Sequence, residues 1–287
     1  MVQSLEAICQ DLDDEREVVR QAAVDALCQD RLRGNPEAIA AAAERLENLH
    51  PEVRRAALVV LSRIAQKGDE FAIDTATARL EHWYPNTRRA AIQAVCELTE
   101  KGDQHAIDVV TSKLEDEHPD VRATAVQALG QIAEKGDAQV IAAVCVHLEH
   151  KQLEVRRAAV QALCQVADRG DEAVMDEVCA RLEHREPEVR EAAVEALALL
   201  ADHADQRAIT ALTSRLEDLC HEVRRAAASA LGRLAEPGDE LVLTALSPRI
   251  EMGRPDVKRA ASDAFSAISP LNASTEDMVK TIKLPAD

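Results

Sequence analysis

The stretch Pro51-Glu52-Val53-Arg54-Arg55-Ala56-Ala57-Leu58 decides the fold, because close copies of it recur along most of the chain. The copies begin every 34 residues, at residues 17, 51, 85, 119, 153, 187, 221 and 255. A fixed period of this length is typical of a repeat protein, in which each unit buries its apolar face against its neighbours. We number the positions within one repeat from 1 to 34, starting at each of these residues.

Each repeat is predicted to form two helices. Apolar residues at positions 3, 7, 10, 11 and 14 follow the 3.6-residue period of the first helix. A glycine at position 18 follows that helix in six repeats, and glycine readily adopts the left-handed conformation that closes a helix. Asp or Asn at position 19 then provides an N-cap for the second helix. Where Ala204 replaces the glycine, we expect a strained turn.

The composition argues against several classes of protein. The formal net charge is −18, which opposes nucleic-acid binding because that depends on a positive surface. No apolar run approaches the roughly 20 residues needed to cross a bilayer, and the start of the chain lacks a secretory signal. The seven cysteines are an odd number and no two are close in sequence, which indicates reduced thiols in an intracellular, most simply cytoplasmic, compartment.

The motif of Val-Arg, then Ala-Ala, then Ala-Leu resembles the second helix of a HEAT repeat, in the short variety found in bilin-lyase-like proteins. Tetratricopeptide repeats share the 34-residue period but need bulky aromatics, which make up only 1% of this chain. The resemblance implies an all-α, right-handed α-solenoid of about eight two-helix repeats over residues 1–268. In the HEAT convention, the helix that begins at each numbered start is the second of its pair, and these helices would line a concave surface. Residues 269–287 depart from the repeat and are predicted to form a polar C-terminal tail.

Position 4 carries a basic residue in every repeat, which indicates a structural role because a binding site usually differs between repeats. We predict that these side chains join neighbouring repeats by pairing with the aspartates at position 19 or with the glutamates at position 31. The basic residues are Arg20, Arg54, Arg88, Arg122, Arg156, Arg190, Arg224 and Lys258, and the aspartates are Asp69, Asp103, Asp137, Asp171, Asp205 and Asp239.

Positions 5 and 9 are predicted to lie on the exposed side of the concave helices, where they form a stripe that varies between repeats. Long polar side chains along a groove suit protein or peptide recognition, although a merely solvated face is the simpler interpretation. The candidate binding residues are Arg55, Arg89, Gln93, Gln127, Arg157, Gln161, Arg225 and Arg259.

Trp83 and Tyr84 lie in one turn between the two helices, whereas other repeats have neither Trp nor Tyr there. An exposed aromatic pair is typical of a binding hot spot. The alternative is that Trp83 covers the adjacent helix ends.

Position 12 is small in every repeat, and Cys28, Cys96 and Cys164 share it. These cysteines suggest either thiol or pigment chemistry, or simply a close approach of neighbouring helices, which we favour.

No catalytic residue, metal ligand or cofactor site is predicted. Deoxyhypusine hydroxylase is a HEAT-like enzyme that holds two irons with His-Glu pairs, in which the His follows the Val-Arg motif. None of the corresponding residues here is His, so the iron ligands are missing. These residues are Gln21, Arg55, Arg89, Ala123, Arg157, Glu191, Arg225 and Arg259. The histidines near the turns lie one repeat apart, which predicts a row and not a metal cage.

The sequence therefore predicts a non-enzymatic scaffold or adaptor that binds another protein or peptide along its concave face, alone or within a larger complex. It predicts neither nucleic-acid binding nor membrane insertion. The resemblance leaves one enzymatic alternative, a bilin (phycobilin) lyase subunit or a chaperone that acts on antenna proteins.

Overall fold

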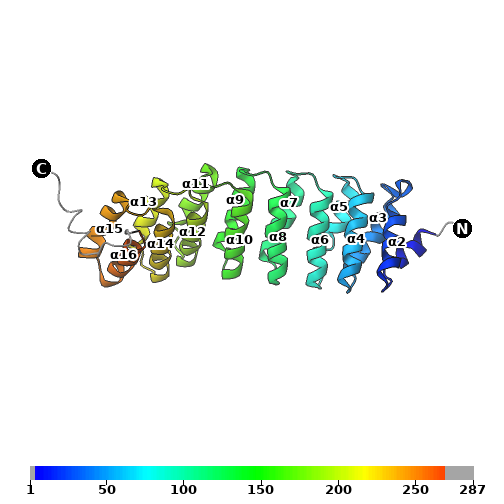
Figure 1. Ribbon diagram of the computed structural model, residues 1–287, viewed down its shortest axis with the longest axis horizontal. Helices are drawn as coiled ribbons and strands as arrows, with labels where there is room; N and C mark the ends of the chain where they lie inside the picture. Colours follow the sequence, from blue (N-terminus) through cyan, green and yellow to red (C-terminus); the bar gives the residue numbers. More distant parts are fainter. Residues whose placement is uncertain (1–3, 269–287) are drawn as a thin grey trace. The chain divides into compact units, whose positions relative to one another are not determined.

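The structure, a computed structural model, describes residues 4–268 as helices joined by short turns, with no strand in that range (Figure 1). The proposed tail at 269–287 lies outside the described residues. The helices group into two compact units, within residues 1–134 (unit 1) and 135–287 (unit 2). Unit 1 contains α1 (Leu5–Asp11), α2 (Glu17–Leu27), η1 (Asp30–Leu32), α3 (Pro36–Glu44), η2 (Arg45–Glu47), α4 (Pro51–Ile64), α5 (Glu70–Thr77), α6 (Pro85–Leu98), α7 (Gln104–Ser112), η3 (Lys113–Glu115) and α8 (Pro119–Ile132). Unit 2 contains α9 (Ala138–Val146), η4 (His147–Glu149), α10 (Leu153–Val166), α11 (Glu172–Arg181), α12 (Pro187–Leu200), α13 (Gln206–Arg215), α14 (His221–Leu234), α15 (Glu240–Met252) and α16 (Pro255–Ile268).

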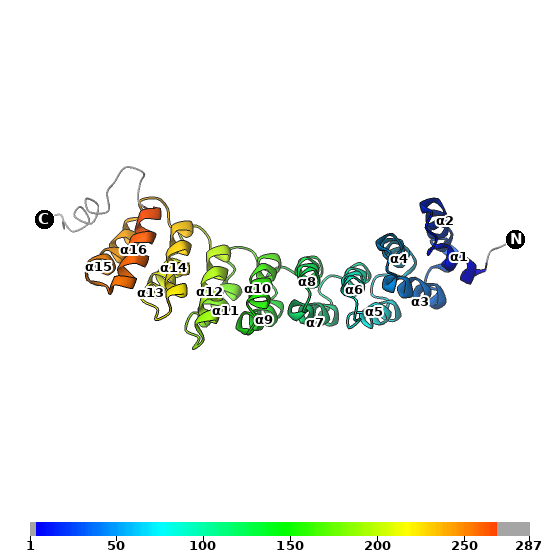
Figure 2. The ribbon, with the colours of Figure 1, turned by 90° about the horizontal axis from the view of Figure 1, so that it is seen from below.

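Within each unit the helices form two rows, one of even-numbered and one of odd-numbered helices (Figure 2). Each odd-numbered helix packs against the even-numbered helix that follows it, and consecutive even-numbered helices of one unit pack side by side. Each helix pair is too thin to enclose a core, so its apolar faces are buried against the neighbouring pairs. This arrangement is the α-solenoid that the repeat predicts.

The even-numbered helices begin at the residues where the sequence repeat begins, from α2 at residue 17 to α16 at residue 255. In α4 the buried residues are Val53, Ala57, Val60, Leu61 and Ile64, which occupy positions 3, 7, 10, 11 and 14. The predicted apolar period therefore forms the buried face of these helices. Pro51 lies at the first position of α4, where its missing N–H leaves no helical hydrogen bond unmade.

From α3 onward, the odd-numbered helices begin directly after the Asp or Asn of position 19. In α5 the side chain of Asp69 accepts a hydrogen bond from the backbone N–H of Ala72, and in α7 Asp103 does the same for Ala106. Such a cap satisfies one of the N–H groups that a helix start leaves without a partner. The same role falls to Asn35, Asp137, Asp171, Asp205 and Asp239.

A backbone hydrogen bond joins each repeat to the next. The N–H of Gly34 donates to the carbonyl of Ile64 at 2.7 Å, so the turn of one repeat holds the end of the following even-numbered helix. The glycine adopts a positive φ of 67°, which L-residues with side chains disfavour. Equivalent bonds link Gly68 to Leu98, Gly102 to Ile132, Gly136 to Val166, Gly170 to Leu200, Ala204 to Leu234 and Gly238 to Ile268.

Ala204 keeps this turn and its hydrogen bond although it is not a glycine. Its φ is 60°, the one positive value among the described non-glycine residues, so the expected strain is present. We predict that Ala204→Gly raises the free energy of unfolding by about 1 kcal/mol, because the left-handed conformation costs an alanine about 1–2 kcal/mol and glycine recovers most of it. Urea unfolding followed by circular dichroism measures the change. A destabilised variant would show that this turn is not strained.

The basic residue at position 4 points back into the turn that precedes its own helix. In α4 the Nη1 of Arg54 donates to the carbonyls of Asn48 and Leu49, at 2.7 and 2.9 Å. The same pair of bonds recurs at Arg20, Arg88, Arg122, Arg156, Arg190 and Arg224, and Lys258 donates to the Glu251 carbonyl. The predicted pairing with the position-19 aspartates is wrong, because those carboxylates cap the odd-numbered helices.

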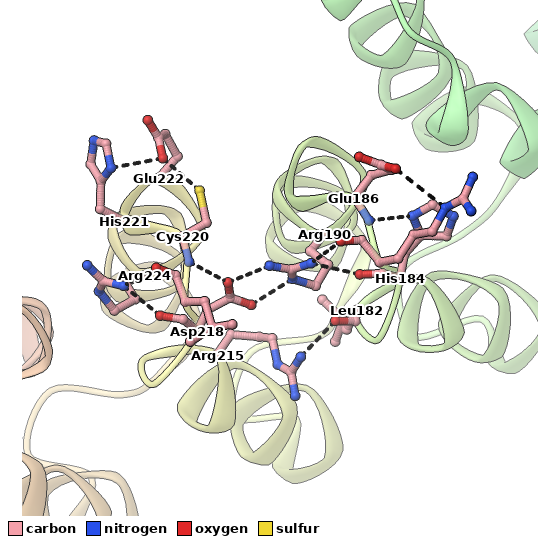
Figure 3. Close-up of polar contacts among 12 residues, drawn as sticks. Leu182, His184, Glu186, Arg190, Arg215, Asp218, Cys220, His221, Glu222 and Arg224 are labelled. Carbon is pink, nitrogen blue, oxygen red and sulfur yellow. Dashed lines mark hydrogen bonds and ion pairs between the residues drawn. The ribbon is translucent and has the colours of Figure 1, made fainter.

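Three of these arginines do join one helix pair to the next, but through other carboxylates. The guanidinium of Arg190 donates two 2.7 Å hydrogen bonds to Asp218 in the next turn (Figure 3). Arg88 binds Asp116 in the same bidentate manner, and Arg224 lies 2.9 Å from Asp256. The prediction missed these acceptors, and two of them, Asp116 and Asp218, occupy position 32.

The glutamates at position 31 also join neighbouring repeats, with a different partner from the one predicted. Five of the seven bind the basic residue at position 29 of the following repeat. These ion pairs link Glu47 with Arg79, Glu81 with Lys113, Glu149 with Arg181, Glu183 with Arg215 and Glu217 with Arg249.

Candidate protein-binding groove

The even-numbered helices of unit 1 carry a polar groove made of three adjoining cavities. One cavity of about 350 Å³ lies between α2 and α4, and one of about 290 Å³ lies between α4 and α6. A third, of about 320 Å³, extends across α4, α6 and α8. Arg55 lines the first two cavities and Gln93 lines the last two, so we treat the three cavities as one surface, the unit 1 groove.

Four predicted binding residues lie in this groove. Arg55 and Arg89 line the cavity between α4 and α6, and Gln127 joins Gln93 in the cavity that reaches α8. All four come from positions 5 and 9, because those positions share the side of the helix opposite the buried stripe. The other polar side chains of that lining include Ser62, Glu97, Thr124 and Gln131.

The other predicted residues belong to unit 2. Arg157, Gln161, Arg225 and Arg259 are exposed on α10, α14 and α16, as their helical positions predict. The predicted stripe thus has four residues in each unit, and those of unit 1 are the ones that line cavities.

Trp83 and Tyr84 lie in the turn before α6 and differ in exposure. Trp83 is 76% exposed, so it does not cover the adjacent helix ends. Tyr84 is half-buried, and its ring centroid lies 5.5 Å from that of Trp83. The Tyr84 hydroxyl accepts a 2.9 Å hydrogen bond from the Asn86 side chain, which itself lines the groove. The aromatic pair thus adjoins the groove.

The guanidinium of Arg54 connects the aromatic pair to the groove. Its central carbon lies 5.9 Å from the centroid of the Tyr84 ring, within the range of a cation–π contact. Arg54 also lines the cavity between α4 and α6. The sequence did not predict this connection, because a helical wheel shows which way a residue points but not which turn residue it meets.

The cysteines at position 12 have little nucleophilic character. Burial raises the pKa of Cys96, which lines the groove, to about 12, and burial also raises the pKa of Cys28 and of Cys164. A thiol that stays protonated near neutral pH reacts slowly, since the thiolate is the nucleophile. All seven cysteines are free.

Three turn histidines accept a backbone hydrogen bond just before the next even-numbered helix begins. The Nδ1 of His82 accepts a 3.1 Å hydrogen bond from the backbone N–H of Tyr84, and His150 and His184 make the same bond two residues on. Across residues 4–268 no three His, Cys, Asp or Glu side chains converge as a metal site would require. Over the same range, no helix has both the length and the apolar character needed to span a membrane.

Family models describe the chain as HEAT repeats, with matches at residues 5–96, 73–164, 107–198, 141–218 and 175–266. The chain belongs to the HEAT-repeat family. These matches cover most of the described residues and agree with the stacked helix pairs.

Among solved structures, importin beta is similar, with 17% identity, a TM-score of 0.51 and coverage of 92% of this chain. The chain spans 40% of the length of that importin beta chain. Human deoxyhypusine hydroxylase matches at 19% identity and a TM-score of 0.36, over 92% of this chain and 95% of its own. An engineered protein matches at 18% identity and a TM-score of 0.37, over 97% and 87%. The comparison with curated proteins gives no significant match.

Proposed function

We propose that this HEAT-repeat protein is a non-enzymatic adaptor that binds a partner protein in the unit 1 groove, inside a reducing compartment. The observation that carries the proposal is the groove itself, where Arg55, Arg89, Gln93 and Gln127 line adjoining cavities beside an exposed tryptophan. Tryptophan, tyrosine and arginine are the residues most enriched at binding hot spots. Glutamine side chains offer both donors and acceptors to the main chain of a bound peptide.

A displayed library of random peptides tests this proposal, because it samples many peptide sequences at once and requires no identified partner. We expect the full chain to select peptides that bind Gln93→Ala/Gln127→Ala about thirtyfold more weakly, because two hydrogen bonds worth about 1 kcal/mol each are lost. Gln10→Ala/Gln206→Ala removes two exposed glutamines from odd-numbered helices and is the matched control. Selection of no peptide, or equal binding by both variants, would overturn the proposal.

A further inference from the structure

The cavity between α4 and α6 concentrates positive charge in a protein whose net charge is −18. Arg54, Arg55 and Arg89 all line it, together with Pro51, Leu58, Asn86, Ala90 and Gln93. No carboxylate belongs to this lining. The adjoining cavities differ, since the one toward α2 includes Glu17 and Glu52 and the one toward α8 includes Glu97.

Arg55 has no carboxylate partner among the described residues, and Arg89 has one only at long range. Among the described residues, no carboxylate lies within ion-pairing distance of Arg55, which is exposed. Arg89 is half-buried and contacts the side chains of Asn86 at 3.3 Å and Thr124 at 3.4 Å. Its nearest carboxylate is the exposed Asp120, at 3.7 Å. Both arginines therefore keep donors for a ligand.

Arg54 is already held in place, which gives the cavity a fixed wall. Its Nη1 donates to two turn carbonyls, and its guanidinium lies near the Tyr84 ring. Beyond Tyr84 the exposed Trp83 provides apolar surface, and Leu49, in the turn before α4, is 65% exposed. A ligand in this cavity thus meets guanidiniums and an aromatic surface in succession.

We propose that the cavity between α4 and α6 binds an acidic peptide segment of the partner, with its carboxylates on Arg55 and Arg89 and an adjacent apolar side chain on Trp83. The proposal rests on the proposed function, because it specifies the chemistry of the ligand for the same groove. Carboxylates fit the cavity because a guanidinium offers them paired donors and nothing in the lining repels them. The aromatic surface favours a segment that mixes acidic with apolar residues over one that is purely acidic.

Peptides from the displayed library provide the test, and Trp83 provides the signal. Trp83 is the only tryptophan in the chain, so its emission reports on this place without a label. We expect the selected peptides to be rich in Glu or Asp next to an apolar residue and to shift the Trp83 emission to shorter wavelength on binding. Versions with Gln in place of Glu should bind at least tenfold more weakly.

Charge variants separate this contact from a folding defect. Arg55→Gln/Arg89→Gln is expected to weaken acidic peptides about a hundredfold, as two charge-assisted hydrogen-bonded contacts are lost. Arg169→Gln/Arg233→Gln removes two exposed arginines of unit 2 that belong to no cavity lining named above, and it should leave binding unchanged. Arg55→Glu should bind peptides with Lys in place of Glu better than the acidic originals, which a misfolded protein would not do.

The outcomes distinguish the two proposals. The acidic ligand would be overturned if the selected peptides depended on Gln93 and Gln127 but carried no acidic residues. It would also be overturned if they bound Arg55→Gln/Arg89→Gln as tightly as wild type. Either result would still support the adaptor proposal. Binding only by phosphorylated peptides, displaced by inorganic phosphate, would also overturn the carboxylate assignment. Failure to select any peptide would overturn both proposals.

Discussion

Replacing Asp218 with alanine is expected to lower the free energy of unfolding by about 3–5 kcal/mol, because it leaves a buried arginine without its counter-charge. The side chains of Asp218 and Arg190 are only 3% and 12% exposed. Asp218 accepts two hydrogen bonds from the guanidinium of Arg190 and a third from the backbone N–H of Cys220, at 2.9 Å (Figure 3). One carboxylate therefore joins α12 to the turn before α14.

Urea unfolding followed by circular dichroism measures this loss, and Asp176→Ala is the control. Asp176 pairs with Arg207 in the same unit, but both side chains are more than half exposed. Exposed pairs contribute about 0–1 kcal/mol, so the control should remain close to wild type. Equal effects of the two substitutions would contradict the structural importance of the buried pair.

The same carboxylate predicts a dependence on pH. Burial alone would raise the pKa of Asp218, but hydrogen bonds from Arg190 and from the Cys220 N–H hold it below its usual value. Stability from a lowered pKa is complete above the unfolded value of about 3.9 and disappears as the pH falls through the folded value. When the pH is lowered from about 5 to about 3, the free energy of unfolding should therefore fall less for Asp218→Ala than for wild type, as urea unfolding at each pH measures.

The helix pairs were predictable because every repeat restates its own boundaries. Proline at position 1, glycine at position 18 and aspartate at position 19 act over one turn of chain, so the sequence alone specifies them. The placement of Arg55 and Gln93 in a groove was predictable for a similar reason, since both follow from the helical period.

The contacts between repeats were less predictable, because they depend on which groups remain free after local bonds form. The sequence offered Asp69 and Glu47 as acceptors for arginine, but Asp69 caps α5 and Glu47 binds Arg79. Asp116 and Asp218 are the position-32 partners of two arginines, whereas Asn48, His82 and His184 occupy that position in other repeats. A repeat-wide rule therefore could not identify the pairing.

Gly232→Leu is expected to lower the free energy of unfolding by about 2–3 kcal/mol, because position 12 of α14 faces α16 at very short range. A Cβ at Gly232 would lie 2.6 Å from the Cβ of Ala267, closer than non-bonded carbon atoms approach each other. A leucine must therefore displace α16, and the strain of overpacking outweighs the helix propensity gained by replacing glycine. Urea unfolding followed by circular dichroism measures the loss, and a variant as stable as wild type would show that α16 yields freely.

Ser62→Leu makes a similar change at the same repeat position in α4 and separates packing from function. Ser62 is exposed and lines the unit 1 groove, so the added side chain has room and stability should change by less than about 0.5 kcal/mol. The leucine instead occupies the cavity shared with Gln93 and Gln127, and we expect it to weaken the selected peptides at least tenfold. Position 12 therefore has no single role: where neighbouring helices are close it must be small to pack, and in the groove its small size leaves space for a partner. A Ser62→Leu protein that binds those peptides as wild type does would place the peptide elsewhere on the surface.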